Sequence, residues 1–121
     1  MEKTALEVFQ SFGQKMMSGN DSWQDLIADD IQFIGPVDQL KGKKAFIELN
    51  ESFMPTVREN NLKQLVESGN WVITQNEMRV AMKTGKTISL DMTEWIEVVD
   101  GKIQLIKVFY DAEEYRKEMN G

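Results

Sequence analysis

The spacing of apolar residues along the chain changes near residue 60, from a period of about 3.6 residues to a period of about 2. Before this point Leu6, Phe9, Phe12 and Met16 recur three and four residues apart, which is typical of one face of an amphipathic helix. After it, apolar and polar side chains alternate, which is typical of strands with one buried face. The chain is therefore expected to begin with helices and to end in a β-sheet.

The first half of the chain predicts three helices around one short strand. Thr4 and Glu7 have the spacing of a capping box at the start of a helix, and Gly19 is suited to end that helix. A second, shorter helix is expected after Asp21 or Ser22, either of which can cap it. The remaining expected elements are a turn at 28–30, a strand at 31–34, a loop at 37–43 and a helix at 44–54.

The second half predicts four strands separated by turn residues such as Gly69, Gly85 and Gly101. Connections this short cannot hold the crossovers that parallel strands need, so neighbouring strands should pair antiparallel. Helices on one side of such a sheet make an α+β fold, and a twisted sheet curls so that helices can close its concave side. The strands are expected at 62–67, 71–82, 87–99 and 103–111, followed by a short polar helix capped by Asp111.

Charge and composition exclude several classes of function for a single domain of 121 residues. The net charge of −6 argues against a nucleic-acid partner, because phosphate contacts need clustered cations. The absence of His and Cys removes the usual zinc ligands and the usual nucleophile–base pairs. We therefore expect no metal and no cofactor. A polar stretch at residues 1–4 and the lack of a long apolar run predict no signal peptide, no membrane contact and a cytoplasmic location.

The predicted strand at 87–99 carries an acid on its apolar face. Side chains alternate between the two faces of a strand, and the odd-numbered positions here are largely polar. The even-numbered positions are Ile88, Leu90, Met92, Glu94, Ile96 and Val98. Burial disfavours the charge of Glu94, and the resulting neutral acid could donate a hydrogen bond to a carbonyl or enolate oxygen. Alternatively, Glu94 pairs with Arg79 or Lys107, or a bulge lets it reach water.

The other inward-facing side chains predict a pocket for a small apolar ligand. Met residues suit such pockets, although filling a core is their commoner use. Tyr110 could likewise point its hydroxyl into the pocket or serve as a core aromatic. The residues expected to contact the ligand are Phe12, Phe33, Asn76, Met78, Met82, Met92, Ile106 and Tyr110.

Apolar side chains also occupy the opposite face of the predicted sheet. Trp71, Trp95 and Phe109 lie there, together with Ile73, Ile103 and Leu105. No predicted helix is left to cover this face, so we expect a homodimer that packs these faces together. The alternative is a monomer whose outer aromatic residues lie singly in solvent.

Short motifs occur in a characteristic order along essentially the whole chain. They are Ala28-Asp29-Asp30, Gly35-Pro36-Val37, Lys41-Gly42-Lys43, Leu90-Asp91, Asp100-Gly101-Lys102-Ile103 and Phe109-Tyr110-Asp111. In order and spacing they resemble the nuclear transport factor 2-like superfamily, in its SnoaL-like and ketosteroid-isomerase-like branch. The resemblance implies a cone-shaped, cystatin-like roll in which helices wrap a curved antiparallel sheet around a pocket, usually as a dimer.

The resemblance carries little of the isomerase chemistry to this sequence. Ketosteroid isomerases use a Tyr on the first helix, an Asp base before the Pro that ends the first strand, and a protonated acid on a later strand. The matching positions here are Phe12, Gly35 and Glu94, so only the acid is kept, one methylene longer. The neutral acid of that isomerase is a known example of a carboxyl group that stays protonated in an apolar site.

Two functions are compatible with these features. The first is a pocket protein that binds an apolar or aromatic carbonyl compound, with Glu94 as the donor and Tyr110 and Asn76 as further polar contacts. As an enzyme it would be an isomerase, cyclase or lyase that transfers a proton, with Asp38 as the candidate base. The second is a non-enzymatic dimerisation or ligand-binding module.

Overall fold

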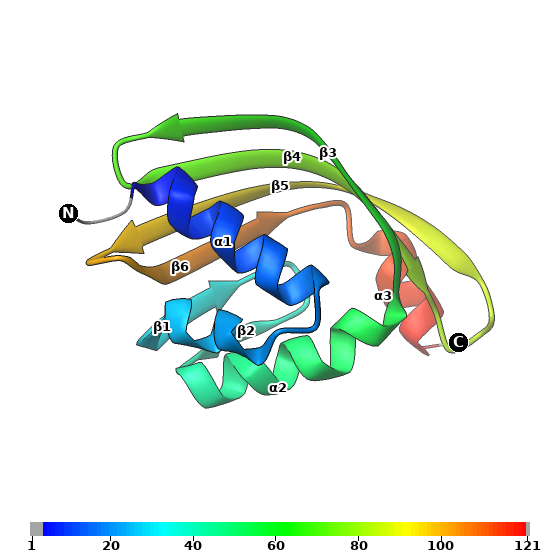
Figure 1. The fold of residues 1–121 in the computed structure, drawn as a ribbon. Helices are drawn as coiled ribbons and strands as arrows, with labels where there is room; N and C mark the ends of the chain where they lie inside the picture. Colours follow the sequence, from blue (N-terminus) through cyan, green and yellow to red (C-terminus); the bar gives the residue numbers. More distant parts are fainter. Residues whose placement is uncertain (1–3, 121) are drawn as a thin grey trace.

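The computed structural model describes residues 4–120, and residues 1–3 of the polar start lie outside this range. It contains a curved six-stranded sheet that folds over two helices (Figure 1). The strands are β1 (Ile27–Ile34), β2 (Gln39–Lys41), β3 (Val57–Ser68), β4 (Trp71–Ala81), β5 (Thr87–Val99) and β6 (Lys102–Phe109). Their order across the sheet is β2-β1-β6-β5-β4-β3. The predicted α+β architecture with a curved sheet is confirmed.

Helices cover the concave side of this sheet (Figure 1). They are α1 (Ala5–Met17), α2 (Lys43–Phe53) and, at one end of the sheet, α3 (Glu113–Asn120). The predicted capping box at the start of α1 is present: the backbone N–H of Glu7 donates to Thr4 Oγ1 at 3.1 Å, and that of Thr4 donates to the Glu7 carboxylate at 3.0 Å. The predicted second, shorter helix is a 3₁₀ helix (Asp21–Leu26), and it is capped by Asn20 instead of Asp21 or Ser22.

The first strand is longer than the sequence predicted, and the expected turn at 28–30 is wrong. β1 runs through these residues because Ile27, Ala28 and Ile31 are all buried, while a bulge between Ile27 and Gln32 absorbs the exposed acids between them. The expected loop at 37–43 holds the short strand β2, which pairs antiparallel with the end of β1. β3 begins at Val57 instead of residue 62.

Strands β3 to β6 form the predicted antiparallel meander, and β1 joins it by pairing parallel with β6. Thr74 of β4 and Val108 of β6 lie directly opposite Glu94 of β5. The expectation that Ile103 lies on the outer face is wrong. A register shift places Leu105 opposite Glu97 but Ile103 opposite Val98, so the bulge between them turns Ile103 inward, where it is 0% exposed.

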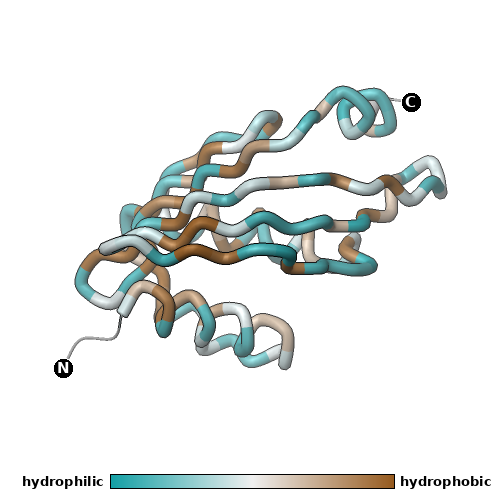
Figure 2. Tube along the Cα trace, turned by 90° about the horizontal axis from the view of Figure 1, so that it is seen from above, coloured by the Kyte–Doolittle hydropathy of each residue, from teal (hydrophilic) through white to brown (hydrophobic). Residues whose placement is uncertain are grey.

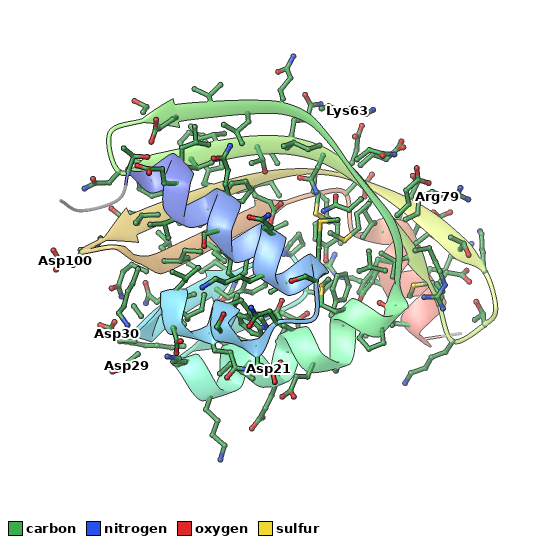
Figure 3. All side chains as sticks on the ribbon, in the orientation of Figure 1. Asp21, Asp29, Asp30, Lys63, Arg79 and Asp100 are labelled. Carbon is green, nitrogen blue, oxygen red and sulfur yellow. The ribbon has the colours of Figure 1, made fainter. Side chains whose placement is uncertain are left out.

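The core lies between the helices and the concave face of the sheet. Phe46 of α2 is buried at its centre, with ring centroids 6.4 Å from Trp23 and 6.1 Å from Phe33. Figure 2 shows hydrophobic and hydrophilic residues alternating along the strands, as a sheet with one buried face requires. Charged side chains such as Lys63, Arg79 and Asp100 point outward at the periphery (Figure 3). Among the helices of residues 4–120, none is long and apolar enough to cross a membrane.

Candidate functional site

A cavity of about 530 Å³ lies between the concave face of the sheet and helices α1 and α2. Its walls are mostly apolar, with many aromatic and methionine side chains, and its size suits a small organic molecule. The predicted site residues on its lining are Phe12, Phe33, Asp38, Met78, Met92, Glu94, Ile106 and Tyr110. The fold therefore brings eight of the ten predicted residues to one space, and their contacts with a ligand stay predictions.

Asn76 and Met82, the other two predicted residues, do not belong to this lining. Asn76 is 2% exposed, and its side-chain Nδ2 donates to Asn60 Oδ1 at 2.8 Å. Met82 follows the end of β4 and packs against the core beside the turn that its backbone N–H forms with Lys86. The contact of these two side chains with a ligand stays a prediction.

Glu94 stands on the cavity wall because its strand neighbours Met92 and Ile96 are buried on the same face. It is half-buried, and its single hydrogen-bond partner among residues 4–120 is Thr74, whose Oγ1 lies 3.4 Å from Glu94 Oε1. The alternative of an ion pair is wrong: Arg79 faces Glu59 at 4.0 Å, and Lys107 lies opposite Trp95 on the outer face.

The surroundings of Glu94 favour its neutral form. Burial raises the pKa of the Glu94 carboxyl above its ordinary value of 4.5, and the hydrogen bond from Thr74 opposes this shift only in part. No buried side-chain oxygen or nitrogen lacks a partner within residues 4–120. Oε2 of Glu94 has no such partner, so this oxygen cannot be fully buried. Because Glu94 lines the cavity, Oε2 is open to it. A protonated carboxyl in that position is a hydrogen-bond donor for a ligand.

A second polar group lines the cavity near α3. The rings of Tyr110 and Tyr115 meet edge to face at 6.2 Å, and Asp38 lies on the lining beside them. Burial raises the pKa of Tyr110 to about 12; Tyr115 and Asp38 add to this shift, whereas Arg116 opposes it. Tyr110 therefore keeps its proton at physiological pH and can donate a hydrogen bond. Arg116 Nη2 donates to the Pro36 carbonyl at 2.6 Å, which ties α3 to the segment that carries Asp38.

Several lining residues were not predicted. Tyr115 was missed because α3 is polar apart from this ring and the exposed Met119. The cluster Arg58, Glu59 and Asn60 was missed because the start of β3 shows no alternation. Other lining residues had a usable signal, since they occupy the apolar faces of the predicted helices. They are Phe9, Gly13, Met16, Leu49 and Phe53.

Comparison with known proteins agrees with this geometry. The model of the SnoaL-like domain family matches residues 8–106 of the sequence. This chain belongs to the SnoaL-like family. It thus falls in the SnoaL-like branch of the nuclear transport factor 2-like superfamily, as the sequence resemblance implied. A comparison with curated proteins gives no match for this SnoaL-like domain.

Solved structures share the fold of this SnoaL-like domain. A nuclear transport factor 2-like protein from Burkholderia xenovorans is 20% identical, with a TM-score of 0.85 over 99% of this chain and 100% of the other. A SnoaL-like polyketide cyclase candidate from Mesorhizobium loti is 20% identical, with a TM-score of 0.74 over 89% and 100% of the two chains. Another, from Jannaschia, is 14% identical, with a TM-score of 0.78 over 97% and 92%.

Replacing Glu94 with Gln should change how the stability of the SnoaL-like domain depends on pH. Because the folded-state pKa of Glu94 is raised, the folded protein binds more protons than the unfolded chain between the two pKa values. The contribution of Glu94 is therefore complete below its ordinary pKa of 4.5 and is lost as pH rises through the folded-state pKa. Urea unfolding at about pH 5 and about pH 8 should show a larger loss of unfolding free energy in the wild type than in Glu94→Gln.

The matched control is Glu97→Gln, on the same strand but on the outer face, opposite Trp71. It should follow the wild type at both pH values. An identical pH dependence in the wild type and Glu94→Gln would contradict the assignment of a neutral acid to the cavity wall.

Proposed function

We propose that this SnoaL-like domain binds a small apolar or aromatic carbonyl compound in its cavity, with neutral Glu94 donating a hydrogen bond to the carbonyl oxygen. The observation that carries this proposal is the position of Glu94, an acid with raised pKa on an otherwise mostly apolar wall. The apolar part of the ligand would bind because it leaves water for the apolar cavity, and the hydrogen bond from Glu94 would fix the orientation of the ligand. A charged ligand is disfavoured, because it would lose its hydration against these walls.

Tyr110 is positioned to supply a second donor to the same ligand. Val108 lies opposite Glu94 in the sheet, and Tyr110, just past the end of β6, follows two residues later and lines the same cavity. Diagonal neighbours of this kind are about 7–8 Å apart at their backbones, a distance that long side chains bridge. A carbonyl oxygen between the two groups could accept from both, and an oxygen with growing negative charge would gain most from them.

Proton transfer is the reaction that these residues support. Asp38 lies on the same lining and supplies a carboxylate to remove a proton next to the carbonyl, while Glu94 and Tyr110 stabilise the enolate oxygen. An isomerase, cyclase or lyase could use this arrangement. Two of the structural relatives are SnoaL-like polyketide cyclase candidates. Without Asp38 in this role, the domain is a non-enzymatic binding module with the same contacts.

We also propose that two copies of the domain pack through the outer faces of their sheets. Trp71 and Trp95 meet edge to face at 6.1 Å, and the side chains of Trp95 and Phe109 are 40% and 55% exposed. The cross-strand register continues this apolar surface through Ile73 to Val66, which is also exposed. Helices α1 and α2 lie on the opposite side of the sheet and leave the patch uncovered (Figure 1). A patch of this kind suits a symmetric, self-complementary interface.

The carbonyl contact can be tested with 2-acetylnaphthalene and naphthalene, which differ by the acceptor. The wild type should bind 2-acetylnaphthalene up to about tenfold more tightly, the value of one ordinary hydrogen bond. Glu94→Leu should remove this preference and keep naphthalene binding, and the wild-type preference should fall as pH rises through the folded-state pKa of Glu94. Titrations followed by tryptophan fluorescence measure both affinities, with Glu97→Gln as control. An unchanged preference in Glu94→Leu would refute the role of Glu94.

Proton transfer has its own test in the same complex. In D₂O, the methyl protons next to the carbonyl of 2-acetylnaphthalene should exchange for deuterium faster with the wild type than without protein, because Asp38 removes them and Glu94 stabilises the enolate. Proton NMR follows the loss of the methyl signal. Asp38→Asn should abolish the enhancement while the affinity stays unchanged. Binding without any enhancement in the wild type would leave the domain a binding module.

The dimer is tested by placing a charge on the outer face. Phe109→Asp should convert a wild-type dimer to a monomer, because a carboxylate in an apolar interface would have to lose its hydration. Light scattering coupled to gel filtration measures the mass, and circular dichroism checks the fold. Met119→Asp, on the exposed surface of α3, is the matched control and should stay dimeric. A monomeric wild type at micromolar concentration would exclude this assembly.

A further inference from the structure

Four polar side chains form a continuous row across β5, β4 and β3, from Glu94 on the cavity wall to Asn60, which is exposed and also lines the cavity. Glu94 Oε1 and Asn76 Oδ1 both lie 3.4 Å from Thr74 Oγ1, and Asn76 Nδ2 donates to Asn60 Oδ1 at 2.8 Å. Thr74 and Asn76 are 1% and 2% exposed, so water does not replace these contacts. Rows of buried polar groups are costly unless every member is satisfied.

The hydroxyl of Thr74 can donate to only one of its two neighbours. Its hydroxyl carries one proton, but it stands at equal distance from two acceptors, Glu94 Oε1 and Asn76 Oδ1. Asn76 can turn its amide only if Asn60 turns its own amide at the same time, because the bond from Nδ2 to Asn60 Oδ1 otherwise keeps Oδ1 toward Thr74. The rotation of a single hydroxyl therefore decides which of the two acceptors is bonded.

Two arrangements of protons satisfy this geometry when Glu94 is protonated. In the first, Thr74 donates to Asn76 Oδ1 and accepts the proton of Glu94 from Oε1, so Oε2 faces the cavity as an acceptor. In the second, Thr74 donates to Glu94 Oε1, so the carboxyl proton sits on Oε2 and faces the cavity as a donor. The first arrangement satisfies all four side chains with the amides as they stand, whereas the second leaves the buried Asn76 oxygen without a donor unless Asn76 and Asn60 both turn their amides.

We propose that Thr74 is a positioning residue that lets Glu94 accept a hydrogen bond from a hydroxyl ligand as well as donate one to a carbonyl ligand. This inference rests on the proposed function of the cavity and extends its ligand class to phenols, enols and alcohols. A hydroxyl ligand matches the fully satisfied arrangement, and a carbonyl ligand requires Thr74 to rotate. The same wall can therefore hold the keto and the enol form of one compound.

The experiment compares 2-naphthol, 2-acetylnaphthalene and naphthalene at about pH 5, near the ordinary carboxyl pKa, because burial raises the pKa of Glu94 and so increases its protonated fraction there. Fluorescence or calorimetric titrations give the three dissociation constants for the wild type, Thr74→Val and Thr74→Ser. The wild type should bind both oxygen-bearing probes more tightly than naphthalene. Thr74→Val keeps the shape but leaves the Glu94 proton without an acceptor when 2-naphthol binds, so the ratio of the two affinities should shift toward 2-acetylnaphthalene by up to about tenfold. Thr74→Ser should restore the wild-type ratio.

The outcomes separate this inference from the function on which it rests. If Thr74→Val weakens both oxygen-bearing probes by the same factor, Thr74 is only structural and the inference fails while the carbonyl site stands. If the wild type prefers 2-acetylnaphthalene but binds 2-naphthol no better than naphthalene, the inference fails in the same way. If neither probe binds better than naphthalene, the proposed function itself fails.

Discussion

The position of Glu94 is enforced by its neighbours in β5, since the acid cannot leave the concave face without taking Met92 and Ile96 with it. Those two side chains are buried, and a slip of one residue would expose both and bury polar residues in their place. The free energy of the apolar face thus holds the carboxyl where its charged form is disfavoured. The strand keeps the acid on the wall, and burial there raises the pKa of its carboxyl.

The cavity exists because the two main helices contact different parts of the sheet. Helix α1 packs against β4, β5 and β6, whereas α2 packs against β1 and β2. Bulges in β1, β3 and β6 curve the strands between these contacts, as extra residues in one strand of a pair do. The space between the helices therefore falls over the middle of β5, where Glu94 lies. The position of the cavity is thus a consequence of the curvature of the sheet. The cavity walls are apolar because they belong to the core that the two helices leave uncovered.

The sequence predicts those features that depend on local alternation. The whole of β5 and the inward face of Glu94 follow from a period of 2 that runs unbroken over the strand. Features that depend on one inserted residue were not predictable. Ile103 turns inward at a bulge that no residue type signals. Asp29 and Asp30 are typical of a turn, although they lie within β1. The polar row is intermediate. Thr74 and Asn76 interrupt the apolar series Val72, Met78 and Val80 in the sequence, whereas no pattern there marks their partner Asn60.

Gly35 occupies the position that matches the Asp base of ketosteroid isomerases. It cannot act as a base because it has no side chain, although a Cβ would fit there. It lies on the cavity lining, and a Cβ built there would stand 3.4 Å from the ring of Phe33, an ordinary contact distance. The backbone N–H of Gly35 donates to the carbonyl of Asp38 at 2.8 Å, and this turn brings the Asp38 carboxylate to the same lining. A loop carboxylate and a strand acid can thus share one cavity in this roll although the residue at the end of the first strand carries no side chain. In the proposed function, Asp38 of the loop would therefore supply the base that Gly35 cannot.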